Sequence, residues 1–212
     1  SLKENEGAVD LKKEGDVIKI TTNKGKYEAR TVIIASGKRS RELNVPGEKE
    51  FKNQGLTYCA TCDGPLFAGK EVAVIGGGNS ALDATLQLIN IAKHIYIINI
   101  TSQLGGDAIM HEKVEQSKIV TIFNNTQVTA ILGDKMVNAI KIKREDTEET
   151  LAVQGVFVEI GLTPNSEFAK DVQKNQFGEI KVNCHNETNI PGIFAAGDVT
   201  DVPEKQIIIA AG

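Results

Sequence analysis

The chain has 212 residues, a formal net charge of -4 at pH 7 and a pI near 5.5, with 3 cysteines and no tryptophan. This balance offers no basic footprint for nucleic acid, and no apolar stretch reaches the length of a membrane span, so neither nucleic-acid binding nor membrane insertion is expected. Three cysteines cannot build the paired framework of a small secreted protein, which favours a reducing cytoplasm with one working pair.

The first segment alternates polar and apolar side chains as the strands of a small antiparallel sheet do. Turn signals at 14–16 and 23–25 divide this segment into strands. A run of mostly β-branched residues follows over 31–36 and is of the kind buried on both faces in a parallel sheet, and Gly37 ends it. We therefore expect an antiparallel meander that leads into a buried parallel strand.

The middle of the chain reads as a β-α-β unit that follows a polar connector through Pro46-Gly47. A strand is predicted over 71–75, and a helix over 80–92 carries apolar residues at helical spacing. The elements expected next are a strand over 94–100, a helix over 108–116 and a strand over 119–123.

A second meander, apolar strand and glycine repeat the pattern of the first segment, which indicates a weak internal repeat. The first copy has no β-α-β unit before it, so we expect that the chain is truncated at its N-terminus. An apolar, helical segment that starts at Lys205 is barely two turns long, so we expect a cut at that end as well. The elements of the second copy are strands over 128–132, 137–143, 150–153 and 156–160, the charged hairpin tip 144–149, and Gly161.

A strand runs directly into the turn Gly76-Gly77-Gly78-Asn79-Ser80-Ala81, which is the context that the dinucleotide-binding G-x-G-x-x-A fingerprint requires. Gly76 would allow the tight turn, Gly78 would let the backbone approach a pyrophosphate, and Ala81 would permit close packing of helix on strand. The helix that opens with Asn79 and Ser80 would hold that pyrophosphate at its N-terminus. A purely structural glycine turn is the alternative.

The choice of nicotinamide cofactor is read at the end of the second strand of such a unit. This chain has Asn99-Ile100-Thr101 there, and no arginine occurs between Arg41 and Arg144 to clamp a 2′-phosphate. NADH is therefore favoured over NADPH. Asn99 could hydrogen-bond the ribose hydroxyl, or it could be an ordinary residue at a strand end.

Cys59 and Cys62 are separated by two residues, a spacing at which two thiols can close a small disulfide. Three interpretations of this pair are open: a redox pair, half of a zinc site, and a purely structural pair. A zinc site would need further ligands, such as Cys184 and His185, which are neighbours in the sequence. Asp63 is placed to donate or accept the proton that dithiol chemistry moves, or it forms the following turn.

Cys184 is expected to be a buried, inert thiol. The three histidines share no spacing and receive no role.

The segment Cys59-Ala60-Thr61-Cys62-Asp63-Gly64, joined to the glycine turn, resembles low-molecular-weight thioredoxin reductases and the flavoprotein component of alkyl hydroperoxide reductase. The likeness extends over essentially the whole chain. Supporting segments are Val32 to Gly37, similar to the family's strand ending in A-T-G; Gly161 to Asn165, similar to its second crossing between domains; and Gly192 to Val199 with Lys205-Gln206-Ile207, similar to its C-terminal FAD motif.

The resemblance implies an α/β fold with two nucleotide-binding, Rossmann-like, three-layer domains of the FAD/NAD-linked disulfide reductase type. The FAD domain would be discontinuous and incomplete, with 1–40 and 161–212 forming it and 41–160 forming the NAD(P) domain that carries the Cys pair. This chain lacks the family's N-terminal G-x-G-x-x-G unit for the FAD pyrophosphate. The implied FAD contacts come from Gly37, Gly197, Asp198 at the ribityl chain, and Lys205, Gln206 and Ile207 near the flavin ring.

The implied activity is flavin-dependent disulfide reduction, with electrons passing from NAD(P)H through FAD to the Cys pair and on to a thioredoxin-like protein. By analogy, Cys62 would face the flavin, Cys59 would attack the external disulfide, Asp63 would act as acid and base, and the middle domain would rotate between its two tasks. The alternatives are an NADH-dependent flavoprotein of a peroxiredoxin (alkyl hydroperoxide) reductase system, because the basic H-R-R cluster of NADPH users is missing, and a non-catalytic nucleotide-binding fragment. The full-length protein would be a cytoplasmic homodimer.

Overall fold

The computed structural model describes residues 1–211, without the side chains of Ile207 and Ile209. The chain forms two compact units: unit 1 comprises Ser1–Arg39 and Leu162–Gly212, and unit 2 comprises Ser40–Gly161. The fold is α/β with a parallel, Rossmann-like sheet, as predicted. No helix among residues 1–211 is both long and apolar enough to cross a membrane.

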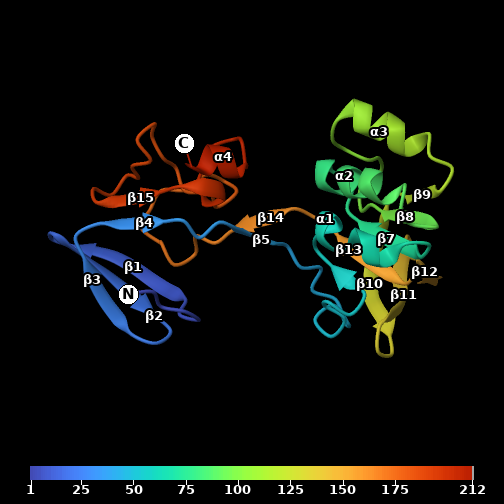
Figure 1. Ribbon diagram of the computed structural model, residues 1–212, viewed down its shortest axis with the longest axis horizontal. Helices are drawn as coiled ribbons and strands as arrows, with labels where there is room; N and C mark the ends of the chain where they lie inside the picture. The colour runs from blue at the N-terminus through green and yellow to red at the C-terminus, as the bar shows by residue number, and fades with distance from the viewer. Residues whose placement is uncertain (212) are drawn as a thin grey trace. The chain divides into compact units, whose positions relative to one another are not determined.

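Unit 1 begins with the predicted antiparallel meander, in the order β1-β2-β3, with the strands Ala8–Glu14, Val17–Thr22 and Lys26–Ala29. The next strand, β4 (Val32–Ile34), pairs in parallel with β15 (Ile193–Ala195), and the two lie side by side in Figure 1. Ile34 faces the core of the unit, whereas Ile33 is 72% exposed. The prediction that this strand is buried on both faces was therefore wrong, because the β4-β15 sheet has two strands and only one of its faces is packed.

The rest of unit 1 is mostly irregular. Between Asn165 and Gly192 the chain forms turns and isolated bridges, and after β15 it forms a 3-10 turn, η2 (Gly197–Val199), and the helix α4 (Ile207–Ala211). Cys184 lies in one of these turns, where the Asn183 side chain accepts hydrogen bonds from two backbone N–H groups, and its thiol is exposed. The expectation of a buried Cys184 was wrong because a tight surface turn leaves no core for the side chain to enter.

Unit 2 is built on a parallel sheet in the order β6-β13-β7-β8-β9. The central strand β7 buries Val72 and Val74 on one face and Ala73 and Ile75 on the other, as an apolar strand without alternation should. The strands are β6 (Leu56–Thr57), β7 (Glu71–Ile75), β8 (His94–Ile98), β9 (Val120–Phe123) and β13 (Gly155–Val158).

Two helices lie on one face of this sheet and a second antiparallel meander lies on the other, which makes three layers (Figure 1). The helix α2 (Asn79–Leu88) is shorter than predicted, because residues 89–93 fold into a turn that bonds to Gly69 and Lys70 and returns the chain to β8. The other elements are α3 (Ala108–Glu115), β10 (Thr126–Gly133), β11 (Val137–Arg144) and β12 (Thr147–Ala152).

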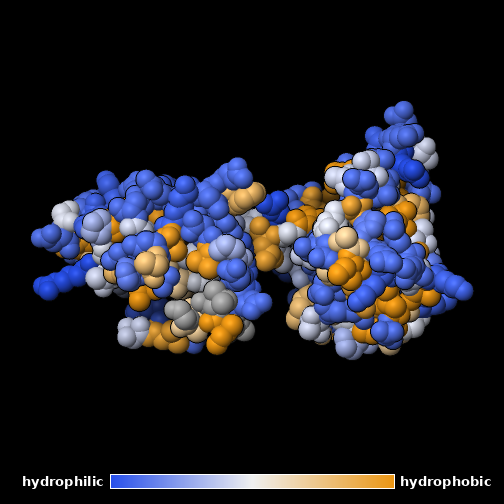
Figure 2. All heavy atoms as spheres, turned by 90° about the horizontal axis from the view of Figure 1, so that it is seen from above, coloured by the Kyte–Doolittle hydropathy of each residue, from blue (hydrophilic) through white to orange (hydrophobic). Residues whose placement is uncertain are grey.

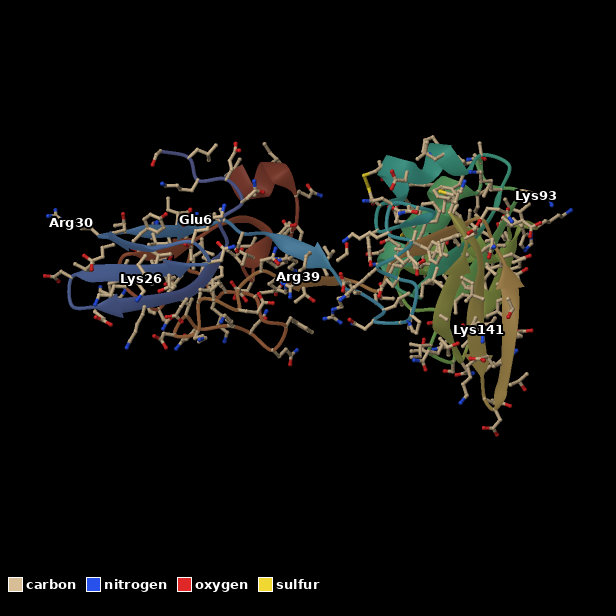
Figure 3. All side chains as sticks on the ribbon, turned by 90° about the horizontal axis from the view of Figure 1, so that it is seen from below. Glu6, Lys26, Arg30, Arg39, Lys93 and Lys141 are labelled. Carbon is tan, nitrogen blue, oxygen red and sulfur yellow. A yellow bond between two sulfur atoms is a disulfide. The ribbon has the colours of Figure 1, made fainter. Side chains whose placement is uncertain are left out.

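Hydrophilic residues cover most of the face drawn in Figure 2, with smaller apolar patches between them. Charged side chains of unit 2 such as Lys93 and Lys141, labelled in Figure 3, form ion pairs that are open to solvent. Such pairs contribute little to stability. Two further short strands, β5 (Lys38–Ser40) and β14 (Leu162–Pro164), form a two-stranded sheet.

Candidate functional site

A cavity of about 740 Å³ in unit 2 opens at the carboxyl ends of β7, β8 and β13. The strand order reverses between β8 and β13, on either side of β7, and this is where open α/β sheets bind ligands. The cavity has the size of a small-molecule site. Sequence-predicted residues that line it are Gly76, Gly78, Asn79, Ser80 and Asn99.

The glycine turn leaves the end of helix α2 free for an anion. Gly76 has φ +134°, and a Cβ there would lie 2.2 Å from the carbonyl oxygen of Glu159. A Cβ on Gly78 would meet nothing within 4 Å, so this backbone borders open space. Gly78 also caps α2 without any side-chain hydrogen bond, and Ala81 packs fully buried behind the turn. The first N–H groups of α2 are thus open to an anion.

Asn99 lies in the cavity wall, but its side chain is committed to the protein. It is 2% exposed, and its amide group donates to Thr101 and to Asn124 while its oxygen accepts from the N–H and O–H of Thr101. An asparagine side chain has two donors and two acceptor positions, and these four bonds use all of them. The same oxygen would lie 2.3 Å from a Cβ on Gly77, which shows that Asn99 shapes the turn.

Other cavity residues were not predicted from the sequence. Arg41 and Glu42 come from the connector before the sheet, and Glu159 follows β13. The Arg41 N–H donates to the carbonyl of Gly161 at 3.0 Å, so the two connectors meet at the cavity rim. Glu159 could have been predicted as a cavity residue from its position at the end of a predicted parallel strand, since the carboxyl ends of such strands meet at one edge of the sheet.

A buried carboxylate holds this connector in place. Glu48 accepts hydrogen bonds from the N–H groups of Leu43 and Asn44 at 2.7 and 2.6 Å and from the hydroxyl of Tyr58 at 2.8 Å. Burial and the Glu48 contact raise the pKa of Tyr58, which keeps its hydroxyl a donor. Glu48 therefore ties the cavity wall to the segment that enters the Cys motif.

Cys59 and Cys62 form a disulfide, visible as a yellow bond in Figure 3, on the short helix α1 (Ala60–Asp63). Cys59 caps this helix, and its sulfur accepts a hydrogen bond from the N–H of Cys62 at 3.1 Å. Cys62 is exposed and Cys59 is half-buried. A cysteine at a helix N-terminus is one whose thiolate is stabilised.

Asp63 ends α1, and its carboxylate accepts a hydrogen bond from the Thr57 hydroxyl at 2.5 Å. Thr57 is itself buried on β6, so the sheet holds the acid beside the disulfide. The three residues predicted as catalytic thus lie together. The 3-10 turn η1 (Gly64–Phe67) follows, and within residues 1–211 no cluster of three His, Cys, Asp or Glu side chains could hold a metal ion.

Unit 1 brings Gly37 and Gly197 to one sheet edge, because β4 and β15 are parallel and both end there. Gly197, Asp198 and Gln206 line a hollow of about 20 Å³, which is room for one water and far less than a flavin occupies. This hollow alone could therefore not enclose a flavin.

Lys205 is engaged elsewhere in unit 1, since its ammonium contacts Glu179 and donates to the carbonyl of Thr200. Lys38 pairs with the same carboxylate at 2.6 Å. Burial alone would raise the pKa of Glu179, but hydrogen bonds from Lys38, Asn175 and Lys205 outweigh it and lower the pKa to about 2. The side chain of Ile207 lies outside the described residues.

Residues 1–211 match the model of the family described as pyridine nucleotide-disulphide oxidoreductase, whose members use FAD and NAD(P)H. The chain is 44% identical over 209 residues to the F subunit of alkyl hydroperoxide reductase from Staphylococcus aureus (strain MSSA476), covering 97% of this chain and 41% of that protein. It is 47% identical over 188 residues to a protein named NADH dehydrogenase of Bacillus subtilis (strain 168), covering 87% and 37%.

Among solved structures, the thioredoxin reductase of T. acidophilum superposes with a TM-score of 0.79 at 37% identity, over 99% of this chain and 70% of that one. The chain spans about two fifths of the length of the curated relatives named above.

Proposed function

This chain belongs to the pyridine nucleotide-disulphide oxidoreductase family, and on that premise we propose that it serves a flavin-dependent disulfide reductase. Electrons would pass from NAD(P)H through FAD to the Cys59–Cys62 disulfide and on to a thioredoxin-like protein. The observation that carries the proposal is a combination within unit 2. A dinucleotide-sized cavity lies over a helix end without a side-chain cap, and the Cys59–Cys62 disulfide has a neighbouring acid that is held in place.

Unit 2 would hold the nicotinamide cofactor. The free N–H groups at the start of α2 would bind its pyrophosphate, with Gly78 leaving room for close approach. Ile100, 69% exposed, lies at the rim where the adenosine ribose belongs and offers no charge to a 2′-phosphate. This favours NADH, in keeping with the relatives named NADH dehydrogenase. The positively charged residue Arg41 also lines this cavity.

Unit 1 would supply part of the FAD site, with Gly37, Gly197, Asp198, Lys205, Gln206 and Ile207 as the proposed contacts. Bound FAD would supply the two-electron relay between nucleotide and disulfide. Rotation of unit 2 about its two connectors remains part of the proposal, as do a cytoplasmic location and a homodimer of the full-length protein.

The Cys pair would then reduce the acceptor in two exchanges. The Cys59 thiolate, stabilised by the N–H of Cys62 and the start of α1, attacks one sulfur of the acceptor disulfide and expels the other as a thiolate. Cys62 next attacks the Cys59 sulfur, which releases the second acceptor thiolate and restores the Cys59–Cys62 bond. Asp63, fixed by Thr57, moves the protons that these thiols lose and gain.

A second candidate is the flavoprotein component of a peroxiredoxin (alkyl hydroperoxide) reductase system. The specific observation in its favour is the 44% identity to the alkyl hydroperoxide reductase protein of Staphylococcus aureus, against 37% to the thioredoxin reductase of T. acidophilum. The two candidates share the cavity and the disulfide and differ in the acceptor protein.

The test uses the full-length protein loaded with FAD. Anaerobic NADH should bleach its yellow colour in both the wild type and Cys62→Ser, whereas reduction of an acceptor disulfide should stop in that variant. Cys184→Ser, in the exposed turn of unit 1, is the matched control and should reduce acceptors normally. Comparing kcat/KM for thioredoxin and peroxiredoxin disulfides separates the two candidates. A Cys62→Ser protein that still reduces acceptors would overturn the proposal.

A further inference from the structure

The nicotinamide end of the cavity can be located from the strand order, given the proposed function on which this inference rests. The adenosine ribose is read at the end of the second strand, β8, and the pyrophosphate lies at the turn after β7. A dinucleotide that crosses the crevice must therefore place its nicotinamide beyond β7, at the end of β13. Glu159, the first residue after β13, lines the cavity at that place.

Glu159 is also connected to the helix that carries the disulfide. Its backbone N–H donates to the carbonyl of Ile75 on β7, which holds it against the glycine turn, and the N–H of Ala60 on α1 lies near enough to its carboxyl group to lower the pKa of that group. The side chain is half-buried between these elements. One carboxyl group thus lies near the redox helix and at the expected nicotinamide position.

We propose that the Glu159 carboxyl group binds the nicotinamide end of the dinucleotide and distinguishes its two redox forms by charge. Opposite the neutral ring of NADH the pKa of the group is unchanged, and its protonated fraction can hydrogen-bond the carboxamide as a neutral acid. Opposite the cationic ring of NAD⁺ it is ionised, and the proton passes to solvent. The consequence is that oxidised and reduced cofactor bind with different pH dependence.

The surroundings place this titration near neutral pH. Burial and the nearby negative charge of Asp83 on α2 raise the pKa of Glu159 to about 7, against the nearby N–H of Ala60, which lowers it. Arg41 and Glu42 on the connector line the same cavity, and Asp63 on α1 is bonded to Thr57. A cationic ring in contact with the carboxylate would lower the pKa, and an opposite charge at such a distance commonly does so by about 1–3 units.

The experiment is calorimetry of NAD⁺ and NADH binding to the full-length protein at pH 7 in buffers of different ionisation enthalpy, which counts the protons released. Wild type should release about half a proton per NAD⁺, because a group of pKa about 7 is half protonated at pH 7, and close to none per NADH. By the same linkage, NAD⁺ affinity should rise about fivefold to tenfold from pH 6 to pH 8.

Two variants and a control make the result specific. Glu159→Gln keeps an acceptor for Ala60 and should bind NAD⁺ without proton release. Asp83→Asn should shift the release to lower pH, because it removes a cause of the raised pKa. Glu149→Gln, on the exposed strand β12, should behave as wild type.

The outcomes separate this inference from the proposed function. Failure of both NAD⁺ and NADH to bind unit 2 would overturn the proposed function and this inference with it. Binding of both forms with equal proton counts, or release that persists in Glu159→Gln, would overturn the role of Glu159 and leave the nicotinamide site standing.

Discussion

Replacing Glu48 with alanine should destabilise unit 2 while leaving unit 1 intact. The Glu48 side chain is 1% exposed and accepts three hydrogen bonds, from Leu43, Asn44 and Tyr58. Two of the donors are backbone groups in the turn where Asn44 adopts φ +58°, a conformation that few residues adopt without support. The variant leaves these donors without their acceptor and frees the turn.

The size of the effect follows from these contacts. A hydrogen bond to a charged group contributes about 1.5–3 kcal/mol, so three of them sum to about 5–9 kcal/mol. The burial of the carboxylate opposes this gain by several kcal/mol, a cost that the variant no longer carries. We therefore expect a net loss of about 3 kcal/mol. Tyr58→Phe removes one of the three bonds and should lose about 1 kcal/mol.

Urea unfolding followed by far-UV circular dichroism measures this loss, with the transition of unit 2 identified by its shift on adding NADH. With an m value of about 2 kcal/mol/M, the midpoint of Glu48→Ala should fall by about 1.5 M. Glu50→Ala, an exposed acid two residues away, is the control and should stay within about 0.5 kcal/mol of wild type. A Glu48→Ala midpoint equal to that of the control would refute the reasoning.

Three further predictions concern charges and close contacts. Glu159→Gln should stabilise unit 2 by about 1–3 kcal/mol at pH 8 but not at pH 4. Because the pKa of Glu159 is raised, the wild type loses stability as pH rises from about 4.5 to about 7, and thermal melting at several pH values checks this. Glu179→Gln should remove stability at pH 7 that wild type loses only as pH falls from about 4.5 to about 2, so acid titration of the two proteins should converge near pH 2. Gly77→Ala should lose about 1–3 kcal/mol of stability by pushing Asn99 aside, whereas Gly78→Ala, which meets open space, should keep its stability and lose about tenfold in NADH affinity by calorimetry.

The glycine turn and the dithiol were predictable because their chemistry is local. The turn from β7 into α2 depends on Gly76, Gly78 and Ala81, which are neighbours in the chain, and the strand before it is marked by an unbroken apolar run. The Cys59–Cys62 pairing likewise needs only one turn of helix. Spacing along the sequence was sufficient evidence for each.

The hydrogen bonds of the Asn99 side chain could not be predicted from the local sequence. Its place after β8 agrees with a ribose contact, yet the structure saturates its amide with Thr101 and Asn124. Asn124 lies 25 residues further along the chain and comes close only because β8 and β9 pair. A side chain's remaining hydrogen-bonding capacity depends on such neighbours, and these follow from the tertiary fold.

The sequence by itself determined the class of fold, the Cys pair and the glycine turn that opens helix α2, because contiguous residues encode all three. Only the tertiary structure decided that Glu159 and Arg41 share the cavity with the glycine turn, that Glu48 anchors its wall, and that Cys184 faces solvent. The physical reason is that the carboxyl ends of parallel strands meet at one edge whatever the length of chain between them, so Glu159 and Gly76, 83 positions apart, come into contact once the sheet forms.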